Sequence, residues 1–134
     1  MNKQKIIFTN GCFDIVHRGH LELFDYCAGL GNLIIGLNSD ESVKKLKGKN
    51  RPINNQADRI KLLLSLKQVN EVHLFDELTP YELIKKIKPD IIVKGGDYTK
   101  NQVVGNDICE VIIFNFIDGY STTKLIDRIV TEHE

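Results

Sequence analysis

Two histidines three residues apart stand where a first helix is expected to begin. His17 and His20 close the stretch Asn10–His20 (NGCFDIVHRGH), which joins a short apolar run to a helical pattern. A spacing of three places both side chains on one side of a helix entrance, and Gly19 between them leaves room for a phosphate near the backbone. Two imidazoles there can donate hydrogen bonds to the oxygens that carry the extra charge of a pentacoordinate phosphorus. Two surface histidines are the alternative, and the preceding GCFD turn favours the functional interpretation.

A second candidate phosphate site lies about a hundred residues further on. The segment 119–124 (GYSTTK) places a glycine and three hydroxyl side chains at the start of the last expected helix. Such a turn offers N–H and O–H donors to phosphate oxygens. Ordinary N-capping by Ser121 is the alternative for this half alone, but the pair of motifs is more specific than either one.

A basic segment stands between these two motifs. Residues 44–51 (KKLKGKNR) carry five cations in eight positions, within a chain whose eighteen basic residues balance eighteen acidic ones. A solvated loop is the usual role of such a run. Beside two candidate phosphate sites, the run favours a mobile clamp over anionic substrates, whose charge it would stabilise.

Short apolar runs alternate with helical patterns, which predicts an α/β fold. Continuous apolar runs are typical of parallel strands buried on both faces, and five occur: Lys5–Thr9, Asn32–Leu37, Glu71–Phe75, Asp90–Val93 and Glu110–Phe114. We expect one domain over residues 1–134, built as a three-layer Rossmann-like sandwich with a five-stranded parallel sheet. In such sheets ligands bind outside the carboxyl ends of the strands, where the motifs fall.

The helical patterns supply the outer layers. Apolar stripes mark helices over Gly19–Leu30 and Gln56–Leu66; the second stripe comprises Ala57, Ile60, Leu63 and Leu64. A third helix is expected over Pro80–Ile87, with Thr79 as N-cap and Pro80 in the first turn. The last follows Ser121, with Leu125, Ile126 and Ile129 facing inward.

Composition narrows the class of protein. The balanced charge argues against a nucleic-acid or membrane binder, and no apolar stretch is long enough to span a bilayer. Three cysteines without close spacing indicate neither a disulfide framework nor a metal site. These features favour a cytoplasmic protein without a protein-held metal.

The motifs carry a resemblance. GCFDIVHRGH resembles the GTFDxxHxGH signature of the HxGH nucleotidyltransferases, with Cys12 where threonine is usual, and GYSTTK resembles that superfamily's triphosphate-binding segment. The strings KGGDYTKNQVVG, RPINNQADRI and DGYSTTKLIDRI are similar to the heptose-phosphate adenylyltransferase branch. The resemblance covers nearly the whole chain, although the segment 106–109 is shorter than in that branch.

The resemblance implies roles for particular residues. His17, His20 and Lys44 would be catalytic, and Asp14, Asp40, Lys44 and Arg59 would bind the acceptor. The residues that would bind the nucleotide are Gly11, Cys12, Phe13, Asp14, Gly19, His20, Lys94, Gly95, Asp97, Tyr120, Ser121, Thr122 and Thr123.

The resemblance also implies a reaction. A phosphate of a sugar or polyol would attack the α-phosphorus of an NTP, preferably ATP, with Mg²⁺ carried by the nucleotide, in a homodimeric enzyme. A CTP-dependent glycerol-3-phosphate cytidylyltransferase is the nearest alternative. A non-catalytic nucleotide-binding module and a flavodoxin-like electron carrier are alternatives of other classes.

Overall fold

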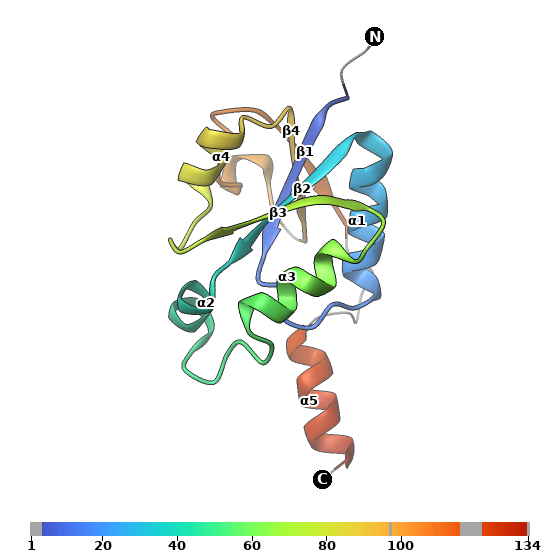
Figure 1. Cartoon of the computed structure of the whole chain (residues 1–134), viewed down its shortest axis with the longest axis vertical. Helices are drawn as coiled ribbons and strands as arrows, with labels where there is room; N and C mark the ends of the chain where they lie inside the picture. Colours follow the sequence, from blue (N-terminus) through green and yellow to red (C-terminus); the bar gives the residue numbers. More distant parts are fainter. Residues whose placement is uncertain (1–3, 97, 116–121, 134) are drawn as a thin grey trace.

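Five parallel strands form the centre of the molecule. The computed structural model describes residues 4–96, 98–115 and 122–133. The strands are β1 (Ile6–Gly11), β2 (Asn32–Asn38), β3 (Val69–Phe75), β4 (Ile91–Gly95) and β5 (Glu110–Phe114), in the order β3-β2-β1-β4-β5 (Figure 1). The expected parallel sheet is confirmed, and each strand bound differs from the expectation by at most two residues.

β1, the central strand, is paired much more extensively with β2 than with β4. β1 pairs with β2 along six residues, from Ile6 to Gly11, but with β4 only at Ile7 and Phe8. The strand order also reverses between β1 and β4, because the chain moves outward to β3 before it returns. The carboxyl ends of β1 and β4 therefore separate at the topological switch point, which is where such folds bind ligands.

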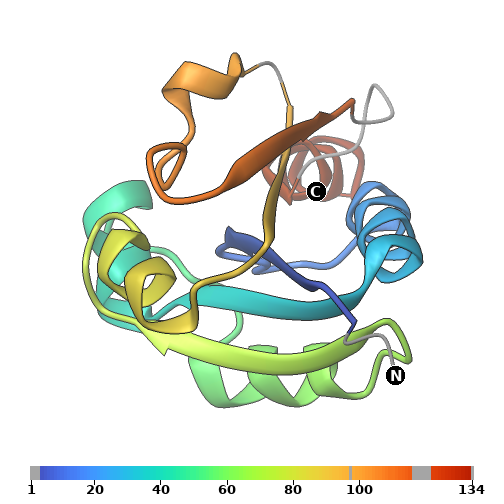
Figure 2. The ribbon, with the colours of Figure 1, turned by 90° about the horizontal axis from the view of Figure 1, so that it is seen from above.

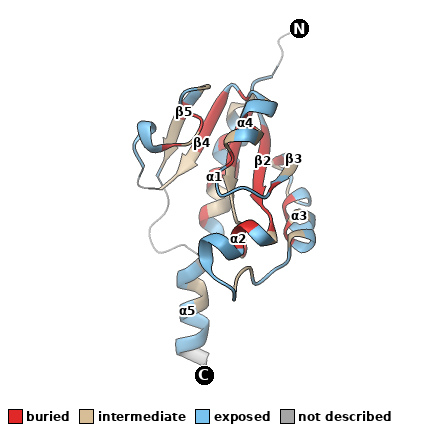
Figure 3. Cartoon of the chain, turned by 90° about the vertical axis from the view of Figure 1, so that its left-hand side faces the viewer, coloured by how far each residue is buried: buried red, intermediate tan, exposed pale blue. Residues whose placement is uncertain are grey.

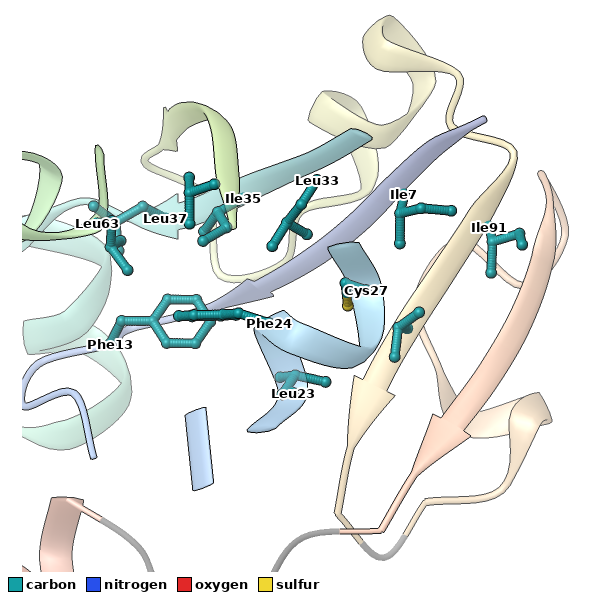
Figure 4. Packing of buried hydrophobic residues seen from close by; sticks show 12 residues of the cluster. Ile7, Phe13, Leu23, Phe24, Cys27, Leu33, Ile35, Leu37, Leu63 and Ile91 are labelled. Atoms are coloured by element: carbon teal, nitrogen blue, oxygen red, sulfur yellow. The ribbon is translucent and has the colours of Figure 1, made fainter. Parts of the chain in front are cut away.

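Helices cover both faces of the sheet (Figure 2). On one face α1 (Arg18–Leu30) and α3 (Gln56–Leu64) pack on a core that includes Ile7, Phe24 and Leu63 (Figure 4). On the other face α4 (Tyr81–Ile87) and the β4–β5 connection, with the 3₁₀ helix η1 (Lys100–Gln102), pack on a second core. Successive side chains of β1 point to opposite faces of the sheet, so Ile7 belongs to the first core and Phe8 to the second.

Two helices differ from their expected patterns. In α3 the buried positions are Arg59 and Leu63, whereas Leu64 is 51% exposed, so the expected apolar stripe is only partly right. In α4 the N-cap is Pro80, which makes no side-chain cap hydrogen bond, so the expected cap at Thr79 is wrong by one residue.

A further helix was not expected. α2 (Asp40–Lys47) covers half of the basic segment, and the Ser39 side chain caps it by accepting from the backbone N–H of Ser42. Cations gather in its last turn, where the helix dipole favours positive charge. The basic segment is therefore a helix end followed by a loop.

The last helix, α5 (Thr122–His133), extends beyond the carboxyl ends of the strands (Figures 1 and 3). Leu125 and Ile126 are half-buried, but Ile129 is 58% exposed. The expectation that Ile129 faces inward is wrong, because this helix projects below the sheet instead of lying across one of its faces (Figure 3).

Candidate active site

A cavity of about 680 Å³ opens at the carboxyl end of the sheet. Asn10 and Gly11 at the end of β1, Asn38 at the end of β2, and Lys94 in β4 line its floor. Thr123 from the first turn of α5 also lines it. The first, central strand and its two neighbours thus contribute to one site, at the point where β1 and β4 separate.

The turn between β1 and α1 is fixed by a buried aromatic ring. Phe13 has a positive φ of 43° and is only 7% exposed. Its ring packs edge-on against His20, with centroids 5.2 Å apart, and against Phe24 at 5.3 Å. Backbone strain of this kind costs roughly 1–3 kcal/mol and persists only where the surroundings enforce it. The packing therefore holds His20 in one place on the cavity wall.

The two histidines cap α1 reciprocally. His17 is the N-cap, and its Nδ1 accepts a hydrogen bond from the Gly19 N–H at 3.1 Å. The Nδ1 of His20 accepts from the backbone N–H of His17 at 3.2 Å. Because each Nδ1 accepts, each neutral ring carries its proton on Nε2. The cap therefore selects the tautomer that makes both imidazoles donors through Nε2.

Both rings are held neutral. They stack with centroids 3.8 Å apart. Burial lowers the pKa of His17, while burial together with the neighbouring His17 lowers the pKa of His20 to about 3. Near neutral pH the pair therefore offers neutral N–H donors, and the positive charge of the site must come from other residues.

Three cations line the cavity from two sides. Lys47 and Arg51 come from the segment after β2, and Lys94 comes from β4. The Lys94 ammonium lies 5.1 Å from the Tyr98 ring centroid, and burial lowers its pKa. Lys44, the expected acceptor contact, is exposed and does not line the cavity.

The Asp14 carboxylate is saturated by groups of the protein. It accepts from the Ile53 and Asn54 backbone N–H groups, both at 2.8 Å, and from Arg51 Nε at 3.0 Å. Burial alone would raise the pKa of this carboxyl, but these donors outweigh it and lower the pKa below its ordinary value. Asp14 borders the cavity while it joins the β1–α1 turn to the basic segment.

Arg59 is buried beneath the site. It is only 2% exposed, although an arginine next to an acidic residue on a helix is ordinarily a surface residue. Its Nη1 donates to the Cys12 and Asn38 carbonyls, at 2.8 and 2.7 Å, and its Nη2 donates to Asp40 Oδ1 at 2.8 Å. Arg59 therefore binds Asp40 and two carbonyls, one just after β1 and one at the end of β2, and neither Arg59 nor Asp40 lines the cavity.

The cavity brings together many of the expected site residues. Gly11, Cys12, Phe13, Asp14, His17, His20, Lys94 and Thr123 all line it. Gly19 is buried within α1, and Gly95 ends β4 without lining the cavity. Asp97, Tyr120 and Ser121 fall outside the described residues, and Thr122 begins α5, its side chain being outside them as well.

One part of the cavity wall, which is largely apolar, was not expected from the sequence. It is formed by residues after β3 and in the β4–β5 connection: Leu78, Thr79, Pro80, Gln102, Val103 and Val104, with Leu46 from α2. The signal for the first three was present, since they follow a strand at its carboxyl end. Nothing in the local pattern of residues 102–104 marks them as cavity residues.

The described residues contain neither a cluster arranged to hold a metal ion nor a helix able to span a membrane. Among residues 4–96, 98–115 and 122–133, no cluster of three or more histidine, cysteine or acidic residues is arranged to hold a metal ion. In the same part of the chain no helix is long and apolar enough to cross a membrane.

Fold and site together define a class: a Rossmann-like α/β protein with a cationic cavity at its switch point. The family model described as cytidylyltransferase-like matches residues 8–130, and the chain belongs to this family of nucleotidyltransferases.

Known relatives share most of the chain. The bifunctional protein HldE of Aliarcobacter butzleri is 57% identical over 128 residues, which cover 94% of this chain and 27% of that protein. The bifunctional protein HldE of Helicobacter pylori strain P12 is 48% identical, over 99% of this chain and 29% of that protein. The chain thus spans under a third of the length of these curated relatives.

A solved structure shares the fold. The lipopolysaccharide core biosynthesis protein from Thermoplasma volcanium superposes with a TM-score of 0.71 at 26% identity, over 89% of this chain and 100% of that one.

Proposed function

We propose that this protein transfers AMP from ATP to a sugar phosphate of the heptose 1-phosphate type and releases pyrophosphate. The observation that carries the proposal is the reciprocal cap of His17 and His20. It presents two neutral N–H donors at a helix N-terminus, within a cavity that also contains Lys47, Arg51 and Lys94. This arrangement suits a reaction in which negative charge increases on the oxygens of a transferring phosphoryl group.

The chemistry requires no protein nucleophile. An oxygen of the acceptor phosphate attacks the α-phosphorus in line, a new P–O bond forms, and the bond to the pyrophosphate oxygen breaks. The attacking oxygen is already ionised, so no general base is required. His17 and His20 donate to the oxygens of the transferring phosphoryl group, and the cations lower the repulsion between the two substrates.

The acceptor and nucleotide roles of other residues follow the family resemblance. The resemblance gives the acceptor phosphate to Lys44, but Lys44 is exposed, and Lys47 and Arg51 line the cavity in its place. The segment from Tyr120 to Thr123 is proposed for the triphosphate, and the cavity position of Thr123 supports this assignment.

Mg²⁺ fits this site as a metal carried by the nucleotide. Among the described residues Asp14 is the carboxylate that lines the cavity, and Arg51 engages it; no cluster of histidine, cysteine and acidic residues there is arranged to hold a metal. Magnesium commonly binds through substrate phosphates and water. It would neutralise part of the triphosphate charge, and the residues of this chain would orient the phosphates around it.

The identity of the substrates rests on the relatives. Proteins named HldE are 48–57% identical to this chain over most of its length. The strings that resemble the heptose-phosphate adenylyltransferase branch include Lys94–Gly105, which borders the cavity. A homodimer is proposed on the same resemblance.

A pyrophosphate-release screen tests the proposal. Four NTPs are crossed with a panel of sugar and polyol phosphates that includes D-glycero-β-D-manno-heptose 1-phosphate and glycerol 3-phosphate. We expect the largest kcat/KM for ATP with the heptose 1-phosphate, and ADP-heptose as the product identified by mass spectrometry. A preference for CTP with glycerol 3-phosphate would replace the substrate assignment and leave the chemistry in place. ATP binding without pyrophosphate release from any pair would favour a non-catalytic nucleotide-binding module.

A further inference from the structure

Arg51 is a cavity-lining cation held in a defined orientation. Its side chain is 15% exposed, and its Nε donates to Asp14 Oδ2 at 3.0 Å. Within the residues that the structure describes, Asp14 is the one recorded hydrogen-bond partner of this guanidinium. The same residues contain no fully buried side-chain nitrogen that lacks a partner, so the two NH₂ groups of Arg51 reach solvent in or beside the cavity. A guanidinium with two NH₂ groups available matches the geometry of a phosphate.

Asp14 is arranged to hold Arg51 and not to bind a ligand. The Asp14 side chain is only 1% exposed, and three protein donors occupy its carboxylate. A fourth contact joins the Asn54 side-chain amide to the Asp14 carbonyl at 2.7 Å. Any influence of Asp14 on a substrate must therefore pass through the segment 51–54.

Arg59 fixes the base of the same segment. Its Nε donates to the Asn54 carbonyl at 3.0 Å, while its Nη1 bonds the carbonyls at the ends of β1 and β2. The loop after α2 is thus tied to the two strands that form the cavity floor. We expected residues 44–51 to form a mobile clamp, but from Arg51 onward hydrogen bonds hold the segment in one conformation. A side chain that is already ordered loses less conformational entropy when it binds a ligand.

The topology separates the cations into two groups. Arg51 and Lys47 lie after β2, on the side of β1 away from β4. The proposed nucleotide contact Lys94 comes from the β4 side, and the proposed triphosphate contact Thr123 comes from the helix after β5. An acceptor that attacks the α-phosphorus approaches opposite the leaving pyrophosphate, so its phosphate falls on the β2 side.

We infer that the Arg51 guanidinium binds the phosphate of the acceptor, and that Asp14 and Arg59 are positioning residues that hold it without touching either substrate. This inference rests on the proposed function. It moves the acceptor contact from the exposed Lys44 to a residue that lines the cavity.

Arg51→Gln tests the contact. We expect kcat/KM for heptose 1-phosphate to fall roughly 10- to 100-fold, the loss that follows removal of a charge-assisted hydrogen bond, while the KM for ATP changes less than about threefold. Added ethylguanidinium should restore part of the lost rate in this variant and none in wild type. Lys61→Gln, on the exposed side of α3, is the matched control and should behave as wild type. An effect confined to the KM for ATP, or no effect, would overturn the assignment.

A double-mutant cycle tests the positioning role. If Asp14 acts through Arg51, Asp14→Asn should weaken acceptor capture, and the double variant should be little worse than Arg51→Gln alone. Effects on kcat/KM that multiply would overturn that role. Should Asp14→Asn not fold, as judged by thermal melting, Arg59→Lys takes its place in the cycle with the same expectation.

Failure of the inference can be told apart from failure of the proposed function. If wild type releases no pyrophosphate with any acceptor, the proposed function fails. Titration calorimetry with inorganic phosphate, in the presence of a non-hydrolysable ATP analogue, then tests Arg51 directly. We expect at least about tenfold weaker phosphate binding in Arg51→Gln than in wild type, and equal binding would refute the contact.

Discussion

The neutral histidine pair makes stability depend on pH in a way that one substitution should remove. Burial and His17 lower the pKa of His20 to about 3 in the folded protein, whereas an unfolded chain has the ordinary value of 6.5. Below pH 6.5 the unfolded state therefore binds a proton that the folded state does not. The contribution of His20 to stability is complete above pH 6.5 and is lost as the pH falls toward 3.

The size of the effect follows from the two pKa values. Between pH 7 and pH 5 the protonated fraction of His20 in the unfolded state rises from about a quarter to nearly one, whereas in the folded state it stays close to zero. Since one pKa unit corresponds to about 1.4 kcal/mol, the expected loss over this interval is ~2 kcal/mol. Asp14 does not interfere, because a carboxyl with a lowered pKa loses its contribution only as the pH falls below about 4.

His20→Gln is the informative variant. Glutamine at the third position of a helix can accept from the N-cap backbone N–H, as His20 Nδ1 does, but it does not titrate. We expect urea denaturation at pH 7 and pH 5 to show a loss of stability about 2 kcal/mol smaller in His20→Gln than in wild type.

An equal loss in wild type and His20→Gln would refute the reasoning. It would mean that His20 titrates in the folded protein as it does in the unfolded chain. The assignment of both rings as neutral Nε2–H donors would then fail as well. An NMR titration of the His20 ring gives an independent check, since its resonance should not shift between pH 7 and pH 5.

Three further outcomes are expected. Gly36→Ala should destabilise the fold by about 1–3 kcal/mol in thermal or urea melts, because its Cβ would lie 2.5 Å from the Phe8 ring; Gly29→Ala, with open space around it, should be neutral or slightly stabilising. Lys47→Ala should raise the acceptor KM more than Lys44→Ala in steady-state assays, because only Lys47 lines the cavity; the opposite order would restore Lys44 as the main contact. ATP should exceed CTP in kcat/KM by at least about tenfold, ~1.4 kcal/mol, since a site built for the hydrogen bonds of one base leaves polar groups unpaired with another.

Local sequence patterns determined the sheet and the place of the site. The apolar runs of the five strands are continuous, as burial on both faces requires, and they alternate with helical segments, which predicts parallel strands. His17 and His20 stand between a strand and a helix, so their position at the carboxyl edge follows from connectivity alone. The balanced charge and the lack of a long apolar stretch likewise argued, from the sequence alone, against a nucleic-acid or membrane binder.

Tertiary structure decided which polar side chains face the cavity and which are used inside the protein. Arg59 follows an acidic residue on a helix with an apolar stripe, so local pattern favours exposure; three carbonyls and Asp40 bury it. Asp14 belongs to the motif, yet donors some forty residues away occupy its carboxylate. Hydrogen bonds between segments far apart in the chain leave no periodic pattern in the local sequence. For that reason only the folded structure distinguishes the positioning residues from those that line the cavity.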